Sequence, residues 1–137
     1  MENVKKNILI ADDDYMLLYS IRFALRSKGH DVTIATNGIS ALYKILSKRN
    51  HYDLLITDIR MPLCDGIQLL DEINQQNIGI PVVVISAYDD HGTTETITSK
   101  GCEHFISKPF TSSELVNCIN TIFNNLPNNN STLTTEV

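Results

Sequence analysis

Short apolar runs alternate with longer amphipathic segments along this chain. Five runs of two to five residues are rich in Val, Ile and Leu, a composition typical of β-strands. The predicted strands lie at residues 8–11, 31–35, 54–56, 82–85 and 105–106. After each run, apolar residues recur at helical spacing. The predicted helices lie between 14 and 29, from 37 to 46, from about 65 past 73, from 89 to 100, and from 111 or 112 to 126.

The predicted helices differ in strength. Asp14 is a candidate cap of the first helix, and Thr111 or Ser112 of the last. In the second helix Ala41, Leu42, Ile45 and Leu46 are expected to face inward. The fourth segment holds four threonines and one glycine, and Ile97 is its only large apolar residue. We therefore expect a weak fourth helix.

Strands that consist almost wholly of Val, Ile and Leu are typical of a parallel sheet covered on both faces. Five strand–helix units with right-handed crossovers then give a doubly wound α/β fold, a (βα)5 arrangement around a five-stranded parallel sheet. The 137 residues are enough for one domain. We expect it to span 1–126, followed by a disordered polar tail or truncated linker at 127–137.

Charge and composition narrow the range of functions. Sixteen acidic against eleven basic residues give a net charge of −5, which disfavours direct nucleic-acid binding and docking on anionic membranes. Cys64, Cys102 and Cys118 are widely spaced, so we expect reduced thiols rather than a disulfide framework. No stretch resembles a signal peptide or a membrane span. These features favour a cytoplasmic protein.

Polar side chains stand where the predicted strands end. Asp12, Asp13 and Asp14 follow the first strand, Asp58 ends the third, Ser86 the fourth, and Lys108 follows the fifth. In an open parallel sheet these ends form the site. Several carboxylates held close together repel one another, and a hard cation such as Mg²⁺ removes that conflict. A carboxylate beside Mg²⁺, a lysine and a hydroxyl is suited to receive a phosphoryl group.

Four motifs carry these residues: 8–14 (ILIADDD), 56–66 (ITDIRMPLCDG), 85–87 (ISA) and 105–110 (FISKPF). In this order and spacing they resemble the receiver domain of two-component response regulators, the family of the chemotaxis protein CheY. The resemblance covers residue 7 to about 126. It implies a flavodoxin-like, CheY-like fold with strand order 2-1-3-4-5.

The resemblance also implies a role for each matching residue. Asp58 is the phosphoacceptor, and the donor is a phosphohistidine of a cognate sensor histidine kinase or phosphotransfer protein. The implied ligands of Mg²⁺, or of Mn²⁺ as a substitute, are Asp12, Asp13, Asp58 and the backbone carbonyl of Arg60. Ser86 and Lys108 contact the phosphoryl oxygens. Such a domain is a signalling module that catalyses only its own phosphorylation and dephosphorylation.

The family further implies a switch. Ser86 moves toward the phosphoryl group and Phe105 turns inward, which reshapes the face of the fourth helix, fifth strand and fifth helix. That face would control an unidentified downstream protein, or would form a phosphorylation-dependent homodimer. Arg60 and Tyr88, two residues beyond Asp58 and Ser86, match positions that tune the phosphoryl lifetime. Simple buried packing is the alternative for Phe105.

Three other interpretations stay open. A haloacid-dehalogenase-like phosphatase would use Asp12 as nucleophile and Asp14 as acid/base, but it leaves Asp58 and Gly66 unexplained. A receiver-like interaction module would never be phosphorylated. The chain could also be the receiver of a longer regulator, cut after Leu126.

Overall fold

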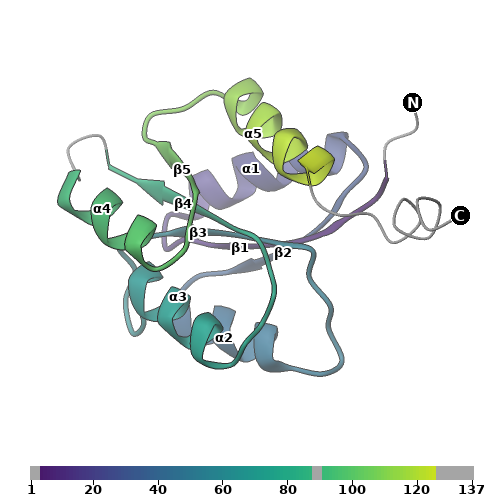
Figure 1. The fold of residues 1–137 in the computed structure, drawn as a ribbon. Helices are drawn as coiled ribbons and strands as arrows, with labels where there is room; N and C mark the ends of the chain where they lie inside the picture. Colours follow the sequence, from purple (N-terminus) through teal and green to yellow (C-terminus); the bar gives the residue numbers. More distant parts are fainter. Residues whose placement is uncertain (1–3, 88–90, 126–137) are drawn as a thin grey trace, which may run out of the picture.

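The computed structural model describes residues 4–87 and 91–125. Strands and helices alternate along the whole described chain (Figure 1). They are β1 Asn7–Ala11, α1 Tyr15–Ser27, β2 Asp31–Ala35, α2 Gly38–Leu46, β3 Leu54–Asp58, α3 Gly66–Gln75, β4 Val82–Ser86, α4 His91–Ser99, β5 His104–Ser107 and α5 Ser112–Asn125. All five predicted strand–helix units are therefore present.

The five strands form one parallel sheet in the order β2-β1-β3-β4-β5. Helices α1 and α5 cover one face, and α2, α3 and α4 cover the other (Figure 1). In β1, Ile8 and Ile10 pack with the α1 and α5 side, whereas Leu9 packs with the other side. This three-layer arrangement confirms the doubly wound (βα)5 fold and its strand order. None of the described helices is both long and apolar enough to cross a lipid bilayer.

Polar side chains fix where the helices begin. Asp14 Oδ1 accepts the N–H groups of Met16 and Leu17 at 3.0 and 3.2 Å, so it caps α1 as predicted. At the start of α5, Thr111 and Glu114 exchange side-chain to backbone hydrogen bonds of 3.1 and 3.2 Å. This reciprocal pair is a capping box, and it assigns the cap to Thr111.

Some details differ from the predictions. Leu46 is 44% exposed, so the expectation that it faces inward is wrong. It is the last residue of α2, and the chain turns to an extended conformation at Ser47. Ile97 is fully buried and anchors α4, whose other described side chains are polar. Cys64, Cys102 and Cys118 are free thiols. Leu126 and the predicted tail 127–137 lie outside the described residues.

Candidate functional site

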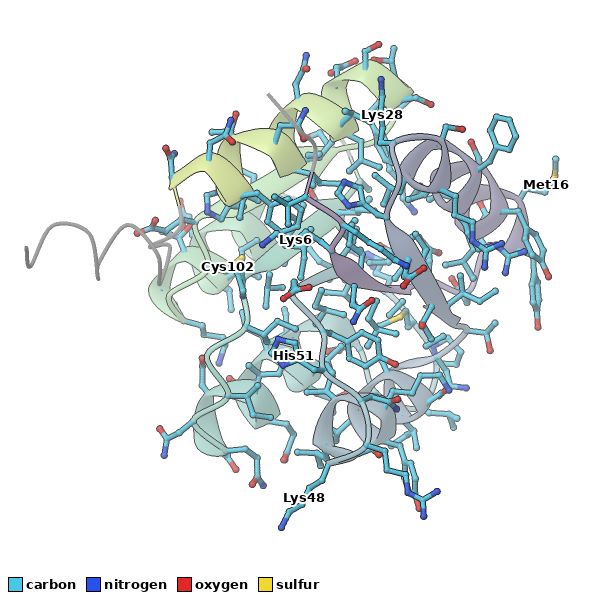
Figure 2. The ribbon with its side chains drawn as sticks, turned by 90° about the vertical axis from the view of Figure 1, so that its right-hand side faces the viewer. Lys6, Met16, Lys28, Lys48, His51 and Cys102 are labelled. Atoms are coloured by element: carbon cyan, nitrogen blue, oxygen red, sulfur yellow. The ribbon has the colours of Figure 1, made fainter. Side chains whose placement is uncertain are left out.

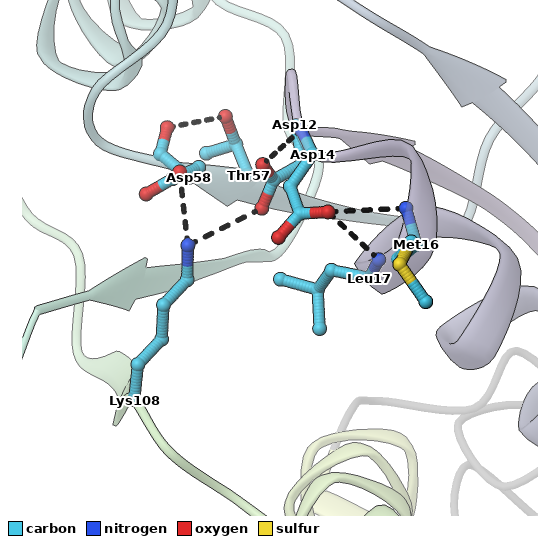
Figure 3. A network of polar contacts seen from close by, with 7 residues as sticks. All are labelled: Asp12, Asp14, Met16, Leu17, Thr57, Asp58 and Lys108. Carbon is cyan, nitrogen blue, oxygen red and sulfur yellow. Dashed lines mark hydrogen bonds and ion pairs between the residues drawn. The ribbon is translucent and has the colours of Figure 1, made fainter.

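The carboxyl ends of four strands bring the predicted polar side chains to one edge of the sheet. Asp12 directly follows β1, Asp58 and Ser86 end β3 and β4, and Lys108 directly follows β5. These strands are neighbours in the sheet, so their ends lie side by side. Figure 3 shows Lys108 reaching across to Asp58 and Asp12.

Three carboxylates form the centre of the site. Asp12, Asp13 and Asp58 each offer an oxygen within 4.8 Å of the others. Asp12 is fully buried and Asp58 is 7% exposed, whereas Asp13 is open to solvent. Such a cluster fits a hard divalent cation, which takes oxygen ligands from carboxylates and keeps part of its water shell.

Lys108 neutralises part of this negative charge. Its Nζ donates to Oδ2 of Asp58 at 3.2 Å and lies 3.6 Å from Oδ2 of Asp12. Burial disfavours the charged ammonium, but the charges of Asp58 and Asp12 outweigh it and raise the pKa of Lys108. The backbone N–H of Lys108 donates to the carbonyl of Ser86 at 2.7 Å, which fixes the lysine beside β4. The Lys108–Pro109 peptide is cis.

Of the three carboxylates in the cluster, that of Asp12 has the least favourable electrostatic environment. Its Oδ1 accepts the N–H of Asp14 at 2.9 Å, but its buried Oδ2 has no hydrogen-bond partner. Burial, with the nearby charges of Asp58 and Asp13, raises the pKa of Asp12 to about 6, against the lowering effects of the Asp14 N–H and Lys108. A buried carboxylate oxygen that accepts no hydrogen bond and lies in an acidic cluster is a suitable ligand for a cation such as Mg²⁺.

The remaining predicted residues surround this centre. Ser86 is 2% exposed at the end of β4. Arg60 is exposed in the loop after β3, where it lines a shallow hollow together with Asp13. Phe105 on β5 is 41% exposed, so its side chain is not packed into the core as the alternative expected. Tyr88 lies outside the described residues.

Other residues that shape the site were not singled out as functional from the sequence. Thr57 is fully buried, and its Oγ1 donates to the carbonyl of Asp58 at 3.0 Å (Figure 3). Gly66 lies so close to β3 that a Cβ atom there would overlap the carbonyl oxygen of Asp58. A Cβ atom on Gly38 would overlap the carbonyl oxygen of Cys64. Both glycines therefore hold the loop that carries Arg60 close to the sheet and to α2.

Replacing Gly38 with Ala is expected to lower the free energy of unfolding by roughly 1–3 kcal/mol, the usual cost of overpacking. The added methyl group must displace the backbone of Cys64, a contact that no side-chain rotation can relieve. Urea denaturation followed by circular dichroism measures the effect. Gly79→Ala is the matched control, since nothing lies within 4 Å of a Cβ atom there. Stabilisation by Gly38→Ala, as helix propensity alone predicts, would contradict the close contact.

Comparisons with known proteins agree with this geometry. A family profile described as "Response regulator receiver domain" matches residues 8–120. The chain is 36% identical over 109 residues to the transcriptional regulatory protein ZraR of Klebsiella oxytoca, a match that covers 80% of this chain and 24% of that protein. It is 37% identical over 107 residues to the sensor protein EvgS of Escherichia coli (strain K12), covering 78% of this chain and 9% of that one.

Solved structures give the same picture. The receiver domain of the Francisella response regulator 1452 superposes with a TM-score of 0.79 at 34% identity, over 87% of this chain and 97% of that one. A CheY-like receiver domain protein from Methanospirillum hungatei JF-1 gives a TM-score of 0.81 at 26% identity, over 88% and 95%. The match spans about a quarter or less of ZraR and EvgS, so their activities as whole proteins do not transfer to this chain by similarity.

Proposed function

Because this chain belongs to the response regulator receiver domain family of two-component signalling, we propose that Asp58 accepts a phosphoryl group. Receiver domains interact with histidine kinases and downstream effectors. The donor would be a phosphohistidine of a sensor kinase or phosphotransfer protein. The observation that carries the proposal is the position of Asp58, whose Oδ2 lies 3.2 Å from Lys108 Nζ within the three-carboxylate cluster.

In the proposed reaction, an oxygen of Asp58 attacks the phosphorus and the phosphorus–nitrogen bond of the donor breaks. The electron pair stays on the leaving imidazole nitrogen, and Lys108 and the Ser86 hydroxyl stabilise the phosphoryl oxygens. The Asp58 side chain is 10% exposed, so a donor can reach it from the open side of the site. Mg²⁺, or Mn²⁺ in its place, would neutralise charge on the transferred group. It would be held by Asp12, Asp13, Asp58 and the carbonyl of Arg60.

Phosphorylation would then change a protein-binding surface. We propose that Ser86 moves toward the phosphoryl group, that Phe105 turns inward from its half-exposed position, and that the α4-β5-α5 face changes shape. A downstream protein, or a second phosphorylated copy, would bind that face. Arg60 and Tyr88 would tune how long the phosphoryl group survives.

The proposed receiver comprises residues 1–126, with 127–137 as a tail or linker. A cytoplasmic location goes with this proposal, because phosphoryl transfer requires the domain to meet the kinase domain of its donor. Neither nucleic acid nor membrane is a proposed direct partner of the domain, consistent with its net charge of −5.

The proposal is tested by incubating the protein with acetyl phosphate and following its intact mass, with and without Mg²⁺. We expect one phosphoryl group to be added only when Mg²⁺ is present. Binding of beryllium fluoride, titrated in the presence of Mg²⁺, provides a second readout, because bound beryllium fluoride mimics the acyl phosphate and does not hydrolyse. Absence of both mass change and beryllofluoride binding would overturn the phosphoacceptor assignment.

Lys108→Ala is expected to slow phosphorylation by acetyl phosphate roughly 10²-fold, the usual cost of losing one group that stabilises developing charge. Lys108 contacts Asp58 directly and is the cation nearest its carboxylate among the described contacts. The initial rate is measured by intact mass at saturating Mg²⁺. Lys100→Ala serves as the control, since Lys100 pairs with Asp71 at 2.6 Å away from the site. Equal rates for both variants would contradict the role of Lys108.

A further inference from the structure

Helix α1 presents an unusually apolar face to solvent. Its buried side consists of Leu18, Ile21 and Leu25. On the remaining faces the exposed large apolar side chains, with their exposed fractions, are Tyr15 (56%), Met16 (84%), Tyr19 (49%) and Phe23 (77%). Figure 2 shows Met16 projecting from α1 at the outer edge of the molecule. Four exposed large apolar residues on one helix are typical of an interaction surface rather than of scattered exposure.

This face already has a defined shape. The rings of Tyr15 and Tyr19 stack with centroids 6.5 Å apart, and the Arg22 guanidinium lies 4.8 Å from the Tyr19 ring. A shallow hollow on the same helix is lined by Tyr19, Arg22, Phe23, Arg26 and Ser27. The first four of these have the i, i+3, i+4, i+7 spacing of the holes that receive side chains in helix pairs. Apolar rings and the aliphatic stems of two arginines therefore form a socket for an apolar side chain.

We propose that α1 is a self-association surface on which two copies of this chain pair antiparallel across a two-fold axis. The axis passes beside the peptide between Tyr19 and Ser20. Residues 16 and 23 are equally distant from that point, so Met16 of each copy enters the hollow around Phe23 of the other. A two-fold interface needs this kind of self-complementarity, with the same patch on both partners.

Charge along α1 selects the antiparallel direction. The helix is preceded by Asp13 and Asp14 and carries Arg26 in its last turn. The axis that seats Met16 also places Asp13 opposite Arg26 of the second copy. A parallel pair would instead set acidic end against acidic end and basic end against basic end. Single surface ion pairs contribute little, but the pattern disfavours the parallel alternative.

The apolar area that α1 can bury sets the expected affinity of the dimer. The exposed parts of the four apolar side chains amount to on the order of 500 Å² per copy, given about 150–250 Å² for a whole aromatic side chain. The pair would then bury about 1,000 Å² in total, at the low end for a specific interface. We therefore expect a weak, concentration-dependent dimer. The inference is independent of phosphorylation, because it uses none of the chemistry of Asp58.

Sedimentation equilibrium of the unphosphorylated full chain, without Mg²⁺ and under reducing conditions, tests the proposal. Between roughly 10 μM and roughly 1 mM, where weak interfaces associate, the wild-type mass should rise toward that of a dimer. Met16→Glu and Phe23→Glu should each raise Kd at least about ten-fold, since each buries a charge in the interface. Tyr43→Glu is the control, because Tyr43 is 78% exposed on α2. A wild-type monomer throughout, or equal loss of association in Tyr43→Glu, overturns the proposal.

Cysteine crosslinking tests the register. Ser20 lies beside the proposed axis and is exposed, whereas the exposed Ser27 lies near the far end of the helix. In a Cys118→Ser background, Ser20→Cys should form disulfide-linked dimers under mild oxidation and Ser27→Cys should not. The reverse preference, or no crosslink from Ser20→Cys, overturns the antiparallel arrangement.

Discussion

Replacing Asp58 with Asn is expected to abolish phosphoryl addition from acetyl phosphate, a loss of at least roughly 10³-fold, while the chain stays folded. An amide oxygen is a poor nucleophile, and removing a catalytic nucleophile has cost up to about 10⁶-fold elsewhere. The fold should survive because Asp58 belongs to a cluster whose charges repel one another. Intact mass in Mg²⁺ measures the label, and circular dichroism verifies the fold.

Two matched variants identify the nucleophile. Asp14→Asn should still accept the label, since Asn caps a helix as well as Asp. Among the described contacts, the side chain of Asp14 accepts only the N–H groups of Met16 and Leu17 in the first turn of α1. Asp12→Asn should label slowly but should recover at high Mg²⁺, because it removes one proposed ligand. If label persists in Asp58→Asn and disappears in Asp12→Asn, then Asp12 is the nucleophile. The phosphatase-like mechanism would then replace the proposed one.

The sequence was sufficient to predict the fold and the meeting of Asp12, Asp13, Asp58 and Lys108. The strand–helix units follow from the alternating pattern of apolar runs and amphipathic segments. The meeting of the side chains follows because the carboxyl ends of neighbouring parallel strands lie at one edge, together with the strand order 2-1-3-4-5 that the resemblance to receiver domains implies. Each short run of Val, Ile and Leu is a strand, so the end of the strand can be predicted to within one or two residues. The polar residue that follows is thereby located at the edge of the sheet. Caps such as Asp14 were predictable for the same reason, since their hydrogen bonds are local.

Features that depend on packing were not predictable. The Oδ2 atom of Asp12 is buried without a hydrogen bond because β1 lies between β2 and β3, which no local pattern reveals. The contact between Gly38 and Cys64 joins α2 to a loop more than twenty residues away. Leu46 matched the helical pattern but lies at a helix end, where the chain already leaves the core. Phe105 is half-exposed, and an apolar residue on a short edge strand can face either way.

Replacing Asp12 with Asn is expected to raise the free energy of unfolding at pH 7.5, without divalent cations, by on the order of 2 kcal/mol. Burial raises the pKa of Asp12 to about 6 in the folded protein. The unfolded value is about 3.9, and each pKa unit corresponds to about 1.4 kcal/mol. At neutral pH the folded chain thus holds an unfavourable charge, which the amide removes. That pKa already includes the attraction to Lys108. The buried amide of the variant has a desolvation cost of its own, so the gain is smaller than the pKa difference alone predicts.

The pH dependence follows from the direction of that shift. The folded state binds the Asp12 proton more tightly than the unfolded state does. The contribution of Asp12 to the free energy of unfolding of the wild type is therefore greatest below about pH 4, and it is lost as the pH rises to about 6. The advantage of Asp12→Asn should therefore vanish near pH 4 and level off above pH 6, as urea titrations in EDTA can measure. Mg²⁺ should reverse the order at pH 7.5 by stabilising the ionised wild type. A variant less stable than wild type at pH 7.5 in EDTA would mean that Lys108 and the Asp14 N–H fully compensate the buried charge.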